Sequence, residues 1–117
     1  MKNNACKTPF WQSLKAQLNN LNAAAFKNAL SQNKDIILLD VRKTEEFKTG
    51  SIPDAINISY LTGDLWEQLE VLDKNKDIFV FCQSGRRSIR VCTLLGNGGF
   101  DSAKIFNLDG GLNEYKL

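Results

Sequence analysis

The residue types best suited to covalent chemistry stand together at positions 82–88, which read Cys-Gln-Ser-Gly-Arg-Arg-Ser. This segment follows the apolar run of residues 78–81 and precedes a helical pattern, so we expect the chain to turn there from a strand into a helix. At such a turn, backbone N–H groups and the positive end of the helix dipole stabilise an anion. The spacing therefore predicts that Cys82 is held as a thiolate nucleophile, with Gly85 allowing the tight curl of the backbone.

The residues that follow Cys82 are predicted to bind an anionic substrate. Arg86 and Arg87 place positive charge beside the loop, which would attract a small dianion and stabilise its leaving group. The loop amides would hold an oxyanion, or an anionic sulfur atom attached to the cysteine. The predicted substrate-binding residues are Gln83, Ser84, Gly85, Arg86, Arg87 and Ser88.

A purely structural role is the alternative for this loop. An isolated cysteine at the end of a strand is more often a buried and inert side chain. Here the neighbouring serines and arginines are polar and costly to bury without a ligand, which favours the functional interpretation. Ser84 and Ser88 have a structural alternative of their own as caps of the following helix, and capping is the role we expect of Ser88.

The sequence contains no histidine, which excludes Cys-His and Ser-His catalytic pairs and zinc sites built on imidazole. Its three cysteines, Cys6, Cys82 and Cys92, are an odd number without Cys-x-x-Cys spacing. This pattern fits neither a disulfide framework nor a four-thiolate metal site, so we expect no metal and no cofactor. It also favours a reducing compartment, and the expected location is the cytoplasm.

Composition places the chain among small soluble domains. It has 117 residues, of which 43% are hydrophobic, and its formal net charge is +2. That small surplus of lysine is spread along the chain, so nucleic-acid binding receives little support. We expect no membrane association, because no apolar stretch approaches the roughly 18 residues of a membrane span and the N-terminus lacks the apolar core of a secretory signal.

Hydrophobic spacing predicts an N-terminal helical extension at residues 1–20 and one domain at residues 21–117. The extension carries one apolar stripe, made of Trp11, Leu14, Leu18 and Leu21. Asn22 is expected to cap a second helix, which ends at Asn33. Strands are predicted at residues 36–39, 55–58, 77–81 and 103–107, and further helices at residues 44–48, 65–72 and 88–95.

Strands that alternate with helices are typical of an α/β fold with a mainly parallel central sheet and helices on both faces. In such sheets the ligand lies outside the carboxyl ends of the strands. We therefore expect Asp40 and Arg42, at one strand end, to support the same site as Cys82. A pair between Arg42 and Glu45 or Glu46 on the next helix is favoured over direct contact with the substrate.

Three other places in the sequence attract notice because they hold thiols or paired glycines. Cys92 lies among apolar residues of a predicted helix, and a core position is favoured over a second redox thiol. Cys6, near the N-terminus, is interpreted as an incidental thiol. Gly110 and Gly111 predict a turn at which the backbone comes close to the Cys82 loop.

The loop resembles the active-site loop of the rhodanese (thiosulfate sulfurtransferase) family, which typically reads Cys-x-x-Gly-x-Arg. Ser51, Asp54 and Tyr115 stand where the family commonly has His, Gly and Trp. The resemblance covers roughly residues 20–117 in the family's order. Apart from the loop, the similar segments are residues 40–42 (Asp-Val-Arg), 46–47 (Glu-Phe), 50–57 (Gly-Ser-Ile-Pro-Asp-Ala-Ile-Asn), 99–100 (Gly-Phe) and 108–112 (Leu-Asp-Gly-Gly-Leu).

This resemblance implies a rhodanese-like fold and a sulfurtransferase that works through a persulfide on Cys82. Thiosulfate or a related small anion would donate the sulfur, and cyanide or a thiol, including one on a protein, would accept it. The alternative is a module of the same fold that binds a partner or delivers sulfur to it without turnover of its own. Arsenate or phosphate ester chemistry is disfavoured, because cysteine phosphatases need an arginine six positions after the cysteine and Ser88 stands there.

Overall fold

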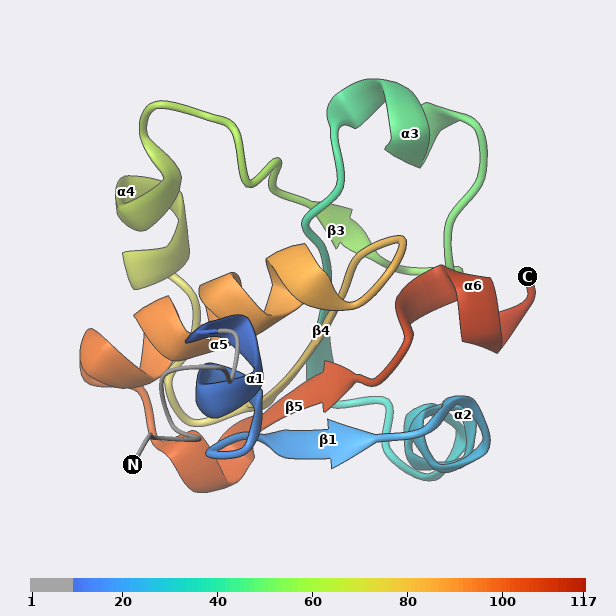
Figure 1. The fold of residues 1–117 in the computed structure, drawn as a ribbon, viewed down its shortest axis with the longest axis horizontal. Helices are drawn as coiled ribbons and strands as arrows, with labels where there is room; N and C mark the ends of the chain where they lie inside the picture. Colours follow the sequence, from blue (N-terminus) through green and yellow to red (C-terminus); the bar gives the residue numbers. More distant parts are fainter. Residues whose placement is uncertain (1–9) are drawn as a thin grey trace, which may run out of the picture.

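The computed structural model describes residues 10–117, which form a five-stranded parallel sheet flanked by helices. The strand order is β1-β5-β4-β2-β3, with every neighbouring pair parallel (Figure 1). The strands are β1 (Asn19–Leu21), β2 (Ile36–Asp40), β3 (Ile56–Asn57), β4 (Asp77–Phe81) and β5 (Ile105–Leu108). The predicted α/β class is therefore confirmed, and the central strand β4 ends directly before Cys82.

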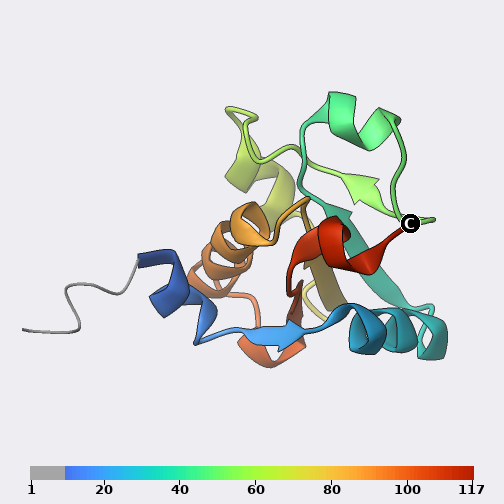
Figure 2. The same ribbon diagram turned by 45° about the vertical axis from the view of Figure 1, so that its right-hand side comes forward.

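Helices cover both faces of the sheet, as predicted (Figure 2). The helices are α1 (Phe10–Lys15), α2 (Ala23–Gln32), α3 (Thr44–Lys48), α4 (Leu65–Glu70), α5 (Arg86–Asn97) and α6 (Gly111–Tyr115), with a short 3-10 turn at Ser102–Lys104. Side chains of α4 and α5 pack on one face, and side chains of α2 and α6 pack on the other. Within residues 10–117, no helix has the length and apolar character needed to cross a membrane.

Strand β4 supplies both cores because its side chains alternate between the two faces of the sheet. Ile78 and Val80 enter the core beneath α5, whereas Phe79 and Phe81 enter the core beneath α2. Phe26 of α2 is fully buried there and packs edge-on against Phe79, with ring centroids 5.4 Å apart. Burial on both faces holds β4 rigidly, and so fixes the position of the loop that begins at its end.

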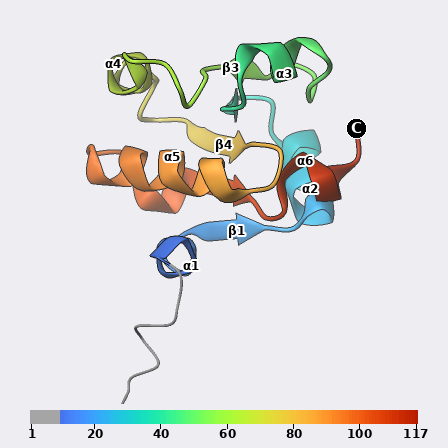
Figure 3. The same ribbon diagram turned by 45° about the horizontal axis from the view of Figure 1, so that its top comes forward.

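The N-terminal segment departs from the predicted continuous apolar stripe. Helix α1 ends at Lys15, and residues 19–21 form the edge strand β1, which pairs with β5 (Figure 3). The Asn20 side chain donates hydrogen bonds to the carbonyls of Lys15, at 2.9 Å, and Leu18, at 3.3 Å, so it closes the end of the helix. The predicted Asn22 cap is confirmed, because its side chain accepts from the Ala25 N–H at 2.8 Å.

Candidate active site

Cys82 lies at the carboxyl end of β4, and its side chain is fully buried against the start of α5. Its Sγ accepts hydrogen bonds from the backbone N–H of Gly85, at 3.1 Å, and of Ser88, at 3.4 Å. Gly85 is the N-cap of a 12-residue helix and Ser88 lies in its first turn, where N–H groups have no partner within the helix and carry its positive dipole end. The sulfur therefore occupies a position that favours negative charge.

Gly85 and Gly111 allow the Cys82 loop and α6 to approach each other closely. Gly85 begins α5 in the left-handed region, with φ of 94°. Gly111 also has a positive φ, of 61°, and a Cβ there would lie 2.5 Å from the carbonyl oxygens of Cys82 and Gln83. Those two oxygens instead accept hydrogen bonds from the N–H groups of Leu112 and Asn113, each at 3.0 Å. The predicted approach of the Gly110 turn to the loop is confirmed.

Ser88 is not a helix cap, contrary to our expectation. Gly85 already starts the helix, which places Ser88 inside its first turn and directs the hydroxyl toward the sheet. This hydroxyl is completely buried, donates to the Asn107 side-chain oxygen at 2.6 Å and lies 3.5 Å from the Cys82 Sγ. Ser88 therefore touches the sulfur with both its N–H and its hydroxyl group.

Asn107 and Asn20 extend this contact into a polar chain that sequence reasoning did not identify. The Asn107 Nδ2 donates to the Asn20 Oδ1 at 2.9 Å, and Asn20 in turn donates to backbone carbonyls at the end of α1. Asn107 itself was the sequence signal for this chain of hydrogen bonds. It stands in an apolar strand, and a fully buried side-chain amide must find polar partners. The chain links the end of α1 to the Cys82 sulfur.

Asp40 and Arg42 form a buried ion pair beside the loop, with the Arg42 Nη2 2.8 Å from the Asp40 Oδ2. The predicted pair between Arg42 and Glu45 or Glu46 is wrong, because the Arg42 side chain folds back over its own strand end. A buried carboxylate needs several donors, and Asp40 also accepts from the Ser51 hydroxyl at 2.7 Å. Ser51 thus donates a hydrogen bond to Asp40 from a position where the rhodanese family commonly has histidine.

Gln83 ties the loop to this ion pair and to α6. Its side-chain oxygen accepts from the Arg42 Nη1 at 3.3 Å, and its Nε2 donates to the Asn113 Oδ1 at 2.7 Å. Ser84, by contrast, is exposed at the tip of the loop. The structure brings Asp40 and Arg42 to the site as predicted, and Gln83 is the residue through which they contact the loop.

The side chains of Arg86 and Arg87 lie against aromatic rings on the outer face of α5. The Arg86 guanidinium lies 4.6 Å from the centre of the Trp11 ring, and that of Arg87 lies 4.5 Å from the Tyr60 ring. Arg87 also pairs with Glu46, with 3.3 Å between the Nη1 and the Oε1. Both arginines remain on the first turn of α5, and their binding of an anionic donor stays a prediction.

Cys92 occupies the core one helical turn beyond Ser88, as expected for a structural cysteine. Burial raises the pKa of its thiol, and the neighbouring Cys82 raises that pKa further. Cys92 is therefore a neutral thiol at physiological pH. Cys6 lies outside the residues that the structure describes. Within the described residues, no group of three or more Cys, Asp or Glu side chains is placed to hold a metal ion.

Comparison with known sequences identifies relatives along most of the chain. A model of the rhodanese-like domain family matches residues 22–117. A Bacillus subtilis protein named "Putative sulfurtransferase YtwF" is 38% identical over 100 residues, which cover 86% of this chain and 92% of the relative. A protein of Allochromatium vinosum named "Sulfurtransferase" is 27% identical over 95 residues, covering 81% of this chain and 85% of the relative. These similarities support sulfur transfer as the general activity.

Solved structures agree with this relationship. A rhodanese-like domain protein from Staphylococcus aureus superposes with a TM-score of 0.73 at 28% identity, covering 84% of this chain and 91% of the other. A rhodanese-related protein from Thermoplasma volcanium gives a TM-score of 0.70 at 30% identity, covering 83% and 89% of the two chains. By its sequence over residues 22–117 and by its fold, the chain belongs to the rhodanese-like domain family.

Proposed function

We propose that this protein is a sulfurtransferase in which Cys82 takes the outer sulfur of thiosulfate, or of a related small anion, and passes it on as a persulfide. The observation that carries the proposal is the pair of N–H groups, of Gly85 and Ser88, directed at the Cys82 Sγ from the start of α5. They supply, without histidine, the stabilisation that a thiolate needs.

The first half-reaction is a displacement at sulfur. A lone pair of the Cys82 thiolate forms a new S–S bond to the outer sulfur of thiosulfate, and the original S–S bond breaks. Its electron pair leaves with sulfite, so no external oxidant or reductant takes part. The positive charge of Arg86 and Arg87 on the first turn of α5 favours approach of the dianion.

The second half-reaction returns the enzyme to its starting state. A cyanide ion or a thiolate attacks the outer sulfur of the persulfide, the S–S bond breaks, and its electron pair remains on Cys82. Between the two steps, the persulfide carries its negative charge on the outer sulfur, and the positive end of the α5 dipole beside Cys82 favours this anion. The acceptor therefore reacts with the outer sulfur of the Cys82 persulfide and not with thiosulfate itself.

Access to the sulfur requires a small movement of the loop, because Cys82 is 0% exposed. The part of the loop able to move is its exposed tip at Ser84. Gln83, by contrast, is held by the Asn113 N–H at its carbonyl and by Arg42 and Asn113 at its side chain. The rest of the site is held firmly, since the end of β4 is buried and so are Ser88 and Ile89 of α5.

The environment of Ser88 weighs against phosphate ester chemistry. A phosphate group has three oxygens that need donors, and Ser88 stands at the sixth position after Cys82, where cysteine phosphatases place an arginine. Here the hydroxyl of that residue is bonded to buried Asn107. The Cys82 loop is therefore better matched to a single sulfur atom than to a phosphate group.

Intact-mass spectrometry after incubation with thiosulfate tests the first half-reaction. The protein is expected to gain the mass of one sulfur atom and to lose it on addition of cyanide. Cys82→Ser should abolish the gain, whereas Cys92→Ser and Cys6→Ser, as matched thiol controls, should keep it. No gain in the wild-type protein would reject thiosulfate as donor and favour a dedicated sulfur-delivery or binding module.

Steady-state kinetics test the order of events. Because the persulfide forms before the acceptor binds, double-reciprocal plots at several cyanide concentrations should give parallel lines. Intersecting lines would mean that donor and acceptor occupy the protein together, which contradicts a free persulfide intermediate.

A further inference from the structure

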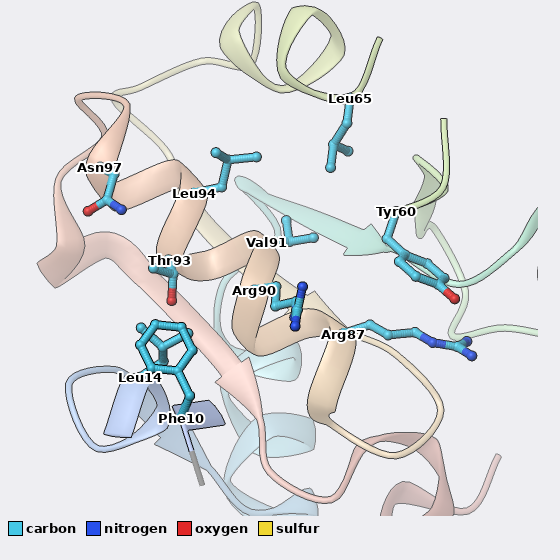
Figure 4. Close-up of a pocket in the computed structure, with 10 residues that line it drawn as sticks. All are labelled: Phe10, Leu14, Tyr60, Leu65, Arg87, Arg90, Val91, Thr93, Leu94 and Asn97. Atoms are coloured by element: carbon cyan, nitrogen blue, oxygen red, sulfur yellow. The ribbon is translucent and has the colours of Figure 1, made fainter. Parts of the chain in front are cut away.

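Two adjoining hollows form a groove along the outer face of α5, next to the Cys82 loop. Their volumes are about 410 Å³ and about 290 Å³, and they share five lining residues. Figure 4 shows α5 as the floor of this α5 groove, with Phe10 and Leu14 of α1 on one side and Tyr60 and Leu65 on the other. The groove therefore separates α1 from the segment that leads into α4.

The interior of the α5 groove is mostly apolar. Val91 and Leu94 of α5 line it together with Leu14 and Leu65. Phe10 is 74% exposed at its edge, which leaves a large aromatic ring in contact with water. An exposed apolar hollow of this kind gains stability when apolar side chains of another molecule fill it.

The rim of the α5 groove is basic. Arg86, Arg87 and Arg90 all line it, and among residues 10–117 no carboxylate lines either hollow. Glu46, beyond the edge, neutralises only Arg87, and Arg90 is exposed. The rim therefore keeps a surplus of positive charge, which complements an acidic ligand.

The α5 groove adjoins the candidate active site through Arg86 and Arg87, and extends beyond the residues that the family model matches. The helix that forms its floor also supplies the N–H groups at the Cys82 sulfur. The wall formed by α1 lies before residue 22, at which the match to the family begins. A ligand in the groove would thus lie against the helix that begins at the Cys82 loop, and would contact a wall outside the residues that the family model matches.

We propose that the α5 groove binds an acidic segment with interspersed apolar side chains on a protein whose thiol exchanges sulfur with Cys82. This inference rests on the proposed function and names the partner for its second half-reaction. The protein thiolate attacks the outer sulfur of the Cys82 persulfide, the S–S bond breaks toward Cys82, and the acceptor leaves as a persulfide.

A protein segment fits this surface better than a nucleic acid. The groove interior offers aliphatic side chains, which match apolar side chains and not phosphodiester groups. The flat faces of the Arg86 and Arg87 guanidinium groups already lie on Trp11 and Tyr60, which leaves them less able to stack on bases. The overall charge of +2 is also small for a nucleic-acid surface.

The test measures sulfur transfer from the isolated Cys82 persulfide to two synthetic acceptor peptides. Both end in cysteine and share the same leucines, but one carries aspartate and glutamate where the other carries glutamine. Each rate is divided by the rate of the same peptide thiol with a small aromatic disulfide, which corrects for differences in thiol reactivity. At low salt the acidic peptide should accept sulfur at least about 10-fold faster than the glutamine peptide, and high salt should remove most of the difference.

Variants that introduce negative charge into the groove locate the effect. Phe10→Glu and Arg90→Glu lie on exposed positions of the groove, and each should slow transfer to the acidic peptide by about 5-fold or more while leaving transfer to cyanide within about 2-fold. Matched controls are Val71→Glu, at a 79% exposed apolar position, and Lys34→Glu, at an exposed basic position, neither of which lines the groove. Both controls should transfer sulfur to the acidic peptide at the wild-type rate.

Three outcomes would overturn the inference. Equal normalised rates for the two peptides, with cyanide turnover intact, would reject the acidic partner while leaving the proposed function in place. Equal effects of the groove variants and the control variants would reject the location. Binding of polyuridylate RNA that Phe10→Glu and Arg90→Glu abolish, with no preference between peptides, would assign the groove to nucleic acid. Absence of the persulfide itself would instead contradict the proposed function.

Discussion

The orientation of the Ser88 hydroxyl is set from a distance by two asparagines. Asn20 donates to two backbone carbonyls, so its Oδ1 must face Asn107, whose Nδ2 donates to it. The Asn107 Oδ1 is left facing Ser88, which donates to it at 2.6 Å. The one hydroxyl hydrogen of Ser88 has two acceptors within reach, the Asn107 Oδ1 at 2.6 Å and the Gly85 carbonyl at 3.2 Å. The shorter contact favours Asn107, and a lone pair of the Ser88 Oγ then faces the Cys82 thiol, 3.5 Å away.

A double-mutant cycle tests this buried pair. Ser88→Ala and Asn107→Leu should each lower the free energy of unfolding by about 1–3 kcal/mol, because each removes one partner of a short, buried hydrogen bond. The double variant leaves neither partner of this bond unpaired, so its loss should be smaller than the sum by at least about 0.5 kcal/mol. Urea denaturation measures all three, and Ser31→Ala, an exposed serine on α2, serves as the control that should add independently to Asn107→Leu. Simple additivity of Ser88→Ala and Asn107→Leu would contradict the coupling.

The Asp40–Arg42 pair should contribute to stability far more than a surface ion pair. Arg42 is 3% exposed and Asp40 is 0% exposed, so Arg42→Ala strands a buried carboxylate and should lower the free energy of unfolding by about 3–5 kcal/mol. Arg87, whose pair with Glu46 is partly exposed, provides the comparison, and Arg87→Ala should lower it by less than about 1 kcal/mol. Similar losses for the two variants in urea denaturation would show that the buried pair has no special role.

The contact between α6 and the Cys82 loop depends on a glycine. Gly111→Ala would place a methyl group 2.5 Å from two carbonyl oxygens, at a φ of 61° that alanine avoids. Relief of this overlap must move α6 away from the loop, which weakens the hydrogen bonds from Leu112 and Asn113. We expect a loss of about 1–3 kcal/mol in stability together with slower persulfide formation.

Gly63 is the matched control for that substitution. An added Cβ at Gly63 has open space around it, and its backbone is not left-handed. Gly63→Ala should therefore leave both stability and the rate of persulfide formation near the wild-type values. If Gly111→Ala were equally mild, the positions of α6 and the loop would be independent of each other.

The sequence predicted those elements whose signals are long or chemically specific. The apolar runs of β2 and β4 and the Asn22 cap were predicted because burial and capping impose residue types directly. Strand β1 was missed, since three residues are too few to show a period and pairing with β5 decides their conformation. The predicted role of Ser88 and the predicted partner of Arg42 were wrong. Several polar residues stand within reach of each, and only the tertiary fold selects among them.

Cys92 links the buried core to the dependence of the protein's stability on pH. Burial raises the pKa of its thiol above the ordinary value of 9.0, and nearby Cys82 adds to the rise. Above pH 9 the unfolded chain therefore releases a proton from Cys92 that the folded protein retains. Because the folded state then binds more protons, this contribution to stability is complete below pH 9 and is lost as the pH rises.

Urea denaturation of the wild type and of Cys92→Ala between pH 8 and pH 10.5, with a reducing agent present, tests this dependence. Above pH 9, the free energy of unfolding of the wild type should fall more steeply than that of the variant by about 1.4 kcal/mol per pH unit. Burial also raises the pKa of Tyr115, but that residue is present in both proteins and cancels in the difference. Parallel curves would mean that Cys92 ionises as readily in the folded protein as in the unfolded chain, so that the core beneath α5 is open to water.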